Sequence, residues 1–312
     1  MPAWDHLLNE FAPLSDEEKG PWLADRITNY LAAVSERRGG RAVMFYASSW
    51  LQKYFAPPAT TQITHEDING FMALVHGMNT GAGLTLLLHT PGGVTNAAET
   101  IVAYLRSKFA SIEVVVPTFA MSAGTMIALG SDRVIMGRQS QLGPIDPQLP
   151  LGNRFVSAEA IVSQFNRAHG EVAGDQRLAH LWAPILQTMG PALLAEAENA
   201  LAYGERMVAG WLASRMLLGQ TNAEALAAET AHFFNDSTTH RSHGRRIDRD
   251  EARAHGVVIE DLEDDQALQE AVLSAYHTVT MAFEIGPAAK MVHSNAGRAW
   301  IKNLNQIVQM PA

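Results

Sequence analysis

The sequence predicts an α/β protein with a largely parallel sheet. Two continuous apolar runs of strand length, "LTLLLHT" (84–90) and "SIEVVVP" (111–117), are typical of strands buried on both faces. The segments between such runs carry apolar residues at helical spacing, so strands and helices alternate. This order predicts parallel strands joined by right-handed crossovers.

The first elements follow that alternation. Residues 17–37 place apolar side chains at helical spacing, and a pair of glycines ends that helix. "RAVMFYAS" (41–48) is rich in β-formers and predicts a strand. A polar, proline-containing loop follows at 52–64, after which Thr64 and Asp67 have the spacing of a helix start.

The next elements lead to the expected working edge of the sheet. The buried run 84–90 ends at a "PGG" turn, and a helix is predicted at 94–109. After the second buried run we expect a short helix at 121–130 and a strand at 132–137. In such sheets the functional groups lie in loops at the carboxyl ends of strands, where both "PGG" and Ser122 fall.

The second half is mainly helical. From about residue 155 the chain is rich in Ala and Leu, and we expect no internal repeat. The predicted elements are helices at 157–170, 191–218 and 222–232, a polar loop or hairpin at 240–265, a long helix at 266–284 and a mixed tail. The predicted parts are an N-terminal helical segment (1–40), an α/β core (41–150) and a mainly helical region packed on it (151–312).

Composition excludes several functional classes. The chain has 312 residues, 47% apolar and 18% charged, which fits one large domain with an extension. Its net charge of −9 disfavours a nucleic-acid surface, and the lack of cysteine removes thiolate catalysis and disulfides. With no signal-peptide pattern and no apolar stretch of membrane-spanning length, we expect a cytoplasmic protein without a membrane span.

Ser122 stands where an acyl-transfer nucleophile could act. It begins a predicted helix, while Gly92 and Gly93 allow backbone N–H groups to approach a ligand closely. A hydroxyl beside free N–H donors supplies a nucleophile and an oxyanion pocket, and small Ala123 leaves room for a substrate carbonyl. The spacing alone fits equally well a serine that caps a buried helix beside a simple turn.

Longer motifs carry a family resemblance. "LLLHTPGG" and "PTFAMSAGTMIALGSDRVIMGRQSQLGPIDPQ" resemble the Clp/crotonase-fold serine peptidases, above all the SDH-type (serine dehydrogenase proteinase) branch related to signal peptide peptidase A. The resemblance implies a Clp/crotonase-like (spiral β-β-α) core with a helical C-terminal extension. It implies that Ser122 is the nucleophile, that Gly93 and Ala123 supply the oxyanion donors and that Gly92 shapes their loop.

The general base departs from the family pattern. The Clp subunit has a histidine roughly two dozen residues after its serine, but "QLGPIDPQLP" contains none. Signal peptide peptidases use a lysine farther downstream, but "VSQFNRAHGEVAG" (162–174) contains none. We predict Lys53 as the base, because it follows the first strand within the aromatic "WLQKYF", where burial would lower its pKa.

Histidines offer rivals to Lys53. His243 could fold back as a base, although its cluster with His240 and neighbouring arginines fits a solvated basic face. His89 precedes "PGG" but fits a hydrogen-bonded core residue, and His169 fits a helix surface. Asp146, between two prolines, is expected to fix a loop through backbone bonds.

Two classes of function fit this sequence. One is a serine peptidase that cleaves peptides or unfolded proteins through an acyl-enzyme. The other is a crotonase-like acyl-CoA enzyme or an inactive binding scaffold of the same fold. We expect no metal or cofactor, and a closed homo-oligomer through apolar faces of helices at 192–202 and 208–218.

Overall fold

The computed structural model describes residues 4–190 and 192–304. The chain forms two compact units: residues 1–142 together with 248–312, and residues 143–247. The chain from Asp248 onward therefore returns to the unit in which it begins. The division into three parts at residues 40 and 150 stays a prediction.

The first unit is built on a mixed, mainly parallel sheet. In the described residues the order is β11-β10-β1-β2-β3-β5-β9. The run β1-β2-β3-β5-β9 is parallel, whereas β10 is antiparallel to β1 and β11 to β10. The strands of this sheet are β1 (Ala42–Ser48), β2 (Leu84–His89), β3 (Ile112–Val116), β5 (Arg133–Met136), β9 (Ile259–Asp261), β10 (Ala288–Ser294) and β11 (Ala299–Asn303). A parallel pair, β4 (Phe119–Ala120) and β6 (Gln141–Leu142), stands beside it.

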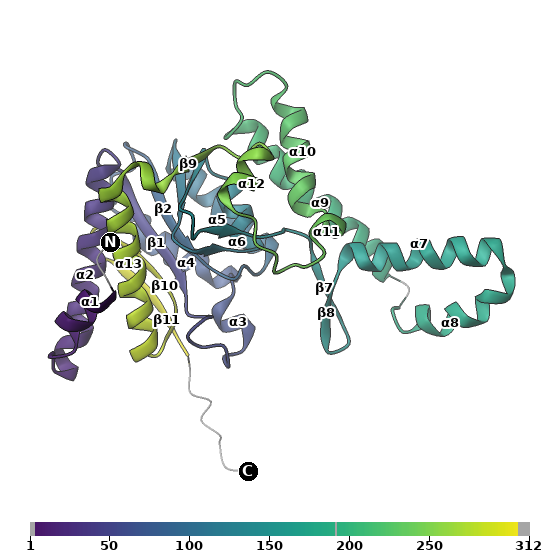
Figure 1. Cartoon of the computed structure of the whole chain (residues 1–312), viewed down its shortest axis with the longest axis horizontal. Coiled ribbons are helices and arrows are strands. Elements are labelled where there is room, and N and C mark those ends of the chain that lie inside the picture. The colour runs from purple at the N-terminus through teal and green to yellow at the C-terminus, as the bar shows by residue number, and fades with distance from the viewer. Residues whose placement is uncertain (1–3, 191, 305–312) are drawn as a thin grey trace, which may run out of the picture. The chain divides into compact units, whose positions relative to one another are not determined.

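Helices cover both faces of this sheet. On one face α2 and α13 lie side by side (Figure 1), and Leu31, Val34 and Val272 pack against Phe45 of β1 in one buried cluster. On the other face α4 packs so closely on β10 and β11 that only glycine fits at position 70. The helices of this unit are α1 (Trp4–Phe11), α2 (Asp16–Arg37), α3 (Pro58–Thr61), α4 (Ile68–Val75), α5 (Thr95–Lys108), α6 (Ala123–Leu129), α12 (Arg249–Ala254) and α13 (Gln266–Ile285).

The predicted α/β core is confirmed. β1, β2, β3 and β5, and the helices between them, begin and end within a few residues of the predicted bounds. β2 and β3 are buried along their whole length, which explains their unbroken apolar runs. The helix start at Thr64 is also present, as a capping box between Thr64 and Asp67.

The C-terminal strands were not predicted. The mixed tail forms β10 and β11, and the polar segment 240–265 contains α12 and β9. β10 is buried at all seven positions but carries Lys290 and His293, so its sequence lacks the apolar signature of a core strand. β9 has only three residues, too few for a periodic pattern.

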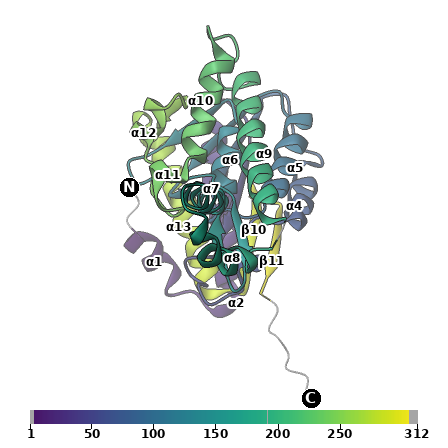
Figure 2. The same ribbon diagram turned by 90° about the vertical axis from the view of Figure 1, so that its right-hand side faces the viewer.

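The second unit is a helical group with one hairpin. The predicted helices are found, although residue 191 lies outside the described residues, and α10 runs alongside α9 (Figures 1 and 2). Ala158, Ile161, Leu193 and Ala197 form its buried cluster. Its elements are β7 (Gln148–Leu151), β8 (Arg154–Ser157), α7 (Ala158–Gly174), α8 (Ala179–Gln187), α9 (Leu193–Ser214), α10 (Ala223–Asn235) and α11 (Ser237–His240). Among the described helices of either unit, none is long and apolar enough to cross a membrane.

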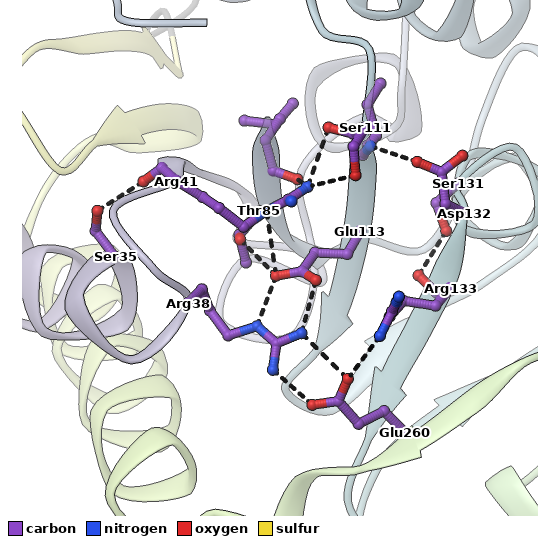
Figure 3. A network of polar contacts seen from close by, with 12 residues as sticks. Ser35, Arg38, Arg41, Thr85, Ser111, Glu113, Ser131, Asp132, Arg133 and Glu260 are labelled. Atoms are coloured by element: carbon purple, nitrogen blue, oxygen red, sulfur yellow. Dashed lines mark hydrogen bonds and ion pairs between the residues drawn. The ribbon is translucent and has the colours of Figure 1, made fainter. Parts of the chain in front are cut away.

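A buried carboxylate ties the amino ends of the strands together. Glu113 at the start of β3 accepts two bonds of 2.7 Å from Arg38 and one of 2.7 Å from Thr85 (Figure 3). Arg38 also reaches Glu260 of β9, so a single guanidinium joins α2 to two strands. Burial opposes ionisation of Glu113, but the bonds from Arg38 and Thr85 and the nearby charges of Arg38 and Arg41 lower its pKa below the ordinary value.

This network predicts a specific acid sensitivity. Because the pKa of Glu113 is lower in the folded state, its stabilisation is complete above the unfolded pKa and is lost as pH falls through the folded pKa. Glu113→Gln should lower the free energy of unfolding by about 2 kcal/mol at pH 7 and flatten its fall below about pH 4.5. Thermal melts of both proteins across this range measure the effect. Exposed Glu17→Gln is the control, and melting curves for Glu113→Gln that parallel the wild type would contradict the assignment.

Candidate active site

Ser122 occupies a strained turn between β4 and α6. Its φ of 51° and ψ of −117° put a non-glycine residue in a region that costs about 1–3 kcal/mol. Such strain persists only where the surroundings fix the backbone. Here the Thr90 N–H donates to Phe119 O (2.9 Å), the Met121 N–H to Thr90 O (3.1 Å) and the Gly124 N–H to Met121 O (2.7 Å). The turn that contains Ser122 is therefore fixed by bonds to Thr90, after β2, and to Gly124, in α6.

Gly92 lies directly against that turn. Its φ is 97°, and an added Cβ would lie 2.6 Å from Ser122 Cβ and 2.6 Å from Met121 O. Both the conformation and the space therefore require glycine. The loop after β2 and the turn after β3, which the sequence placed at one edge of the sheet, are in contact.

Gly93 is fixed against a different segment. An added Cβ would lie 2.3 Å from Ile63 O, and φ is 151°. The Ile63 N–H donates to Gly92 O (2.7 Å), and the Val94 N–H donates to Ile63 O (2.9 Å). Ile63 thus pairs as a short parallel bridge with Gly93 and sets the direction of its backbone.

Three groups at this edge have no hydrogen-bond partner among the described residues. They are the N–H of half-buried Gly93, the N–H of fully buried Ala123 and the hydroxyl of half-buried Ser122. Buried backbone donors are nearly always paired, so the unpaired N–H of buried Ala123 next to the serine indicates a place for a ligand oxygen. In this arrangement the Ser122 hydroxyl can attack a substrate carbonyl. The N–H groups of Gly93 and Ala123 can then stabilise the oxyanion that forms.

Lys53 is buried as expected, but its ammonium has a protein partner. The side chain follows β1, is 8% exposed, and Nζ donates to the backbone carbonyl of Phe283 at the end of α13. Nζ also lies 5.7 Å from the centre of the Phe283 ring. Burial lowers the pKa of Lys53, the direction a base needs. Within the described chain no hydrogen bond joins Lys53 to Ser122.

His89 is a core residue. It is 2% exposed, its Nδ1 lies 2.9 Å from Thr118 Oγ1, and its ring packs against Tyr276. Burial lowers the pKa of His89 to about 3, so this imidazole stays neutral at physiological pH. Sequence reasoning assigned it the same structural role.

The second unit contains an imidazole–carboxylate pair. His243 Nδ1 lies 2.7 Å from Asp146 Oδ1, and Gln148 donates to Asp146 Oδ2 at 2.7 Å. The Asp146 side chain is 2% exposed and that of His243 33%. Asp146 therefore acts through side-chain bonds rather than the backbone bonds expected from its sequence. With Nδ1–H directed at a carboxylate, Nε2 of a neutral His243 is the proton-accepting nitrogen.

His240 differs from the solvated role expected for its cluster. It is 4% exposed, with Nε2 2.6 Å from Phe233 O and Nδ1 2.9 Å from Arg245. His169 lies on the exposed surface of α7, as expected.

The sequence analysis did not identify the residues that fix Gly92 and Gly93, called here the glycine loop. The backbone next to Gly93 is held in place by Ile63, Asp67 and Lys290. Asp67 was recognised only as part of a helix start. Lys290 comes from a strand that pairs with β1 across more than two hundred residues, so no local pattern could find it.

Comparisons with known proteins identify the family of this chain. The model of a protein family described as "ClpP-like SDH-type serine proteinase" matches residues 17–183, which are just over half of the chain. An uncharacterized protein of Methanocaldococcus jannaschii is 36% identical over 124 residues, which are 40% of this chain and 42% of the relative. A second from the same organism is 28% identical over 145 residues, 46% of this chain and 48% of the relative. The chain thus spans less than half the length of these curated relatives.

A solved structure with a partly similar arrangement is a variant of a membrane-bound stomatin-specific protease. It has 20% sequence identity and a TM-score of 0.36, with 64% of this chain and 75% of that chain covered. The family match rests instead on the segment that contains β1 to β6, both glycines and Ser122. The chain belongs to the ClpP-like SDH-type serine proteinases.

Proposed function

We propose that this protein is a serine peptidase that hydrolyses peptide bonds in peptides or unfolded proteins through an acyl-enzyme on Ser122. The observation that carries the proposal is the strained Ser122 beside two N–H groups, of Gly93 and Ala123, that have no partner in the described chain. A purely structural serine would gain nothing from that backbone strain. A closed homo-oligomer and a cytoplasmic location stay predictions.

The reaction follows from these groups. Ser122 Oγ attacks the scissile carbonyl carbon while a base takes the hydroxyl proton. The carbonyl oxygen becomes an oxyanion that accepts hydrogen bonds from the Gly93 and Ala123 N–H groups. The C–N bond breaks as the protonated base returns the proton to the departing amine. Water, activated by the same base, then attacks the ester and releases Ser122.

Covalent labelling tests this proposal against the crotonase-like alternative. A fluorophosphonate should phosphonylate Ser122 and abolish cleavage of an unfolded polypeptide. A crotonase-like enzyme polarises a thioester carbonyl with the same N–H groups but does not require the serine. Acyl-CoA turnover that persists in Ser122→Ala, with no peptide cleavage by the wild type, would reject the peptidase assignment.

Lys53 is our first candidate for the base. A lysine base must be neutral, and burial lowers the pKa of Lys53. Lys53→Met should therefore reduce kcat by about a hundredfold or more, and Lys53→Arg should not restore it because arginine stays protonated. The wild-type rate should rise with pH through one ionisation below that of a free lysine. Exposed Lys108→Met is the control; full activity in Lys53→Met would exclude this base.

His243 is the second candidate, favoured by its bond to buried Asp146. An imidazole oriented by a carboxylate is the usual form of a catalytic base. If His243 is the base, His243→Gln reduces kcat while Lys53→Met does not, and exposed His255→Gln leaves the rate unchanged.

A further inference from the structure

A buried ion pair stands behind the glycine loop. Lys290 of β10 and Asp67 before α4 have side chains 1% and 0% exposed, and Lys290 Nζ lies 2.6 Å from Asp67 Oδ1. The ammonium also donates to Gln62 O at 2.9 Å and to Thr64 Oγ1 at 3.2 Å. The ammonium is thus held by two hydrogen bonds, to Gln62 O and Thr64 Oγ1, and by its ion pair with Asp67.

Asp67 completes the arrangement with its second oxygen. Asp67 Oδ2 accepts the Thr64 N–H at 2.9 Å and the Tyr46 hydroxyl at 2.9 Å. Burial and the Asp67 charge raise the pKa of Tyr46, so the phenol keeps its proton and remains a donor. Lys290 and Asp67 together thus fix the backbone at Gln62 and Thr64.

Ile63 lies between those two fixed residues. Its N–H donates to Gly92 O at 2.7 Å, and its carbonyl accepts the Val94 N–H at 2.9 Å. The ion pair therefore holds one edge of a short backbone bridge, and Gly93 forms the other edge. The contacts of Lys290 with Gln62 and Thr64 therefore reach Gly93 through Ile63, which lies between them and bonds to Gly92 and Val94 on either side of Gly93.

We propose that Lys290, paired with Asp67, is a positioning residue that orients the Gly93 N–H for the developing oxyanion. This inference rests on the proposed peptidase function. A buried ion pair is weak evidence for stability, because desolvation offsets much of its attraction. It is well suited to fix one backbone geometry, since its bonds to the residues on either side of Ile63 hold only while that segment stays in place. Small displacements of an oxyanion donor lower the rate steeply.

A neighbouring ion pair provides a matched control. Lys302 of β11 reaches the same turn and binds Glu66 with two contacts of 2.9 Å, but these side chains are 34% and 47% exposed. Exposed pairs contribute little, and Glu66 makes no contact with Ile63 among the described hydrogen bonds. The double substitution Lys302→Met/Glu66→Gln should therefore leave both amide exchange in the glycine loop and kcat unchanged.

The informative variant is the double substitution Lys290→Met/Asp67→Asn. It removes both charges together, whereas Lys290→Met alone leaves a buried unpaired carboxylate. Amide hydrogen exchange at Ile63 and Val94 should accelerate about tenfold or more relative to the control. The kcat should fall about tenfold or more with KM changed less than about twofold, because the lost interaction acts in the transition state.

Thr64→Val is a less disruptive variant that tests the same proposal if the double variant does not fold. It removes one acceptor of the ammonium and keeps the ion pair, so exchange and kcat should shift in the same direction by less. Unchanged exchange, or faster exchange with wild-type kcat, overturns the positioning role. If exchange is faster in the double variant but the wild type and Ser122→Ala are equally inactive, the two conclusions separate. The ion pair then does fix the glycine loop, and the proposed peptidase function is rejected.

Discussion

Ser122→Ala should reduce kcat/KM for peptide cleavage by roughly 10⁴-fold to 10⁶-fold, because removing a nucleophile that works with a base and an oxyanion pocket disables them as a unit. The fold should survive, since the hydroxyl has no partner in the described chain. Initial rates and a thermal melt on the same preparation measure both effects. Residual cleavage within about tenfold of wild type would remove Ser122 from the mechanism.

Two companion variants separate the chemistry of Ser122 from its backbone strain. Ser122→Gly should be as inactive as Ser122→Ala but more stable by about 1 kcal/mol, because glycine adopts a φ of 51° without steric cost. If the alanine and glycine variants melt together, the turn does not store the strain assigned to it. The control is Ser131, a buried serine whose hydroxyl donates to Ala128 O, where alanine should reduce stability rather than catalysis.

Gly93→Ala should be the second most damaging change. The new Cβ would lie 2.3 Å from Ile63 O and 2.5 Å from Ile63 N, so the bridge to Ile63 must open. Opening it displaces the Gly93 N–H, and loss of one oxyanion donor lowers kcat by about 10²-fold to 10³-fold. Steady-state kinetics should show this loss mainly in kcat, together with slower fluorophosphonate labelling of Ser122.

Gly39→Ala is the matched control for backbone strain. Gly39 also has positive φ, of 70°, but an added Cβ meets nothing within 4 Å. This variant should lose stability and keep wild-type kcat. Equal kinetic losses in both variants would show that Gly93→Ala acts through general destabilisation and not through the oxyanion donor.

The parallel part of the fold could be predicted because its strands are buried on both faces. Fully buried β2 and β3 leave unbroken apolar runs, and the helices between them leave periodic ones. The same order placed "PGG" and Ser122 at one edge, and the structure brings Gly92 against Ser122. Topology alone accounts for this part of the candidate site.

The remainder depends on pairings that no local pattern encodes. β10 carries buried Lys290, whose charge is offset by Asp67 far away in the sequence, so the strand does not read as apolar. The carbonyl of Phe283 that accepts from Lys53 belongs to a helix more than two hundred residues later. The sequence could predict that Lys53 is buried near aromatic groups, but it could not predict which atom accepts the hydrogen bond from its ammonium.

The most direct test of the central claim is detection of the acyl-enzyme. Rapid mixing of wild type with an activated peptide ester should release a burst of one equivalent of alcohol per active site. Intact-mass analysis of the quenched protein should then show one added acyl group, on the peptide that contains Ser122. Peptide cleavage without a burst, or an acyl group on any other residue, would contradict the account.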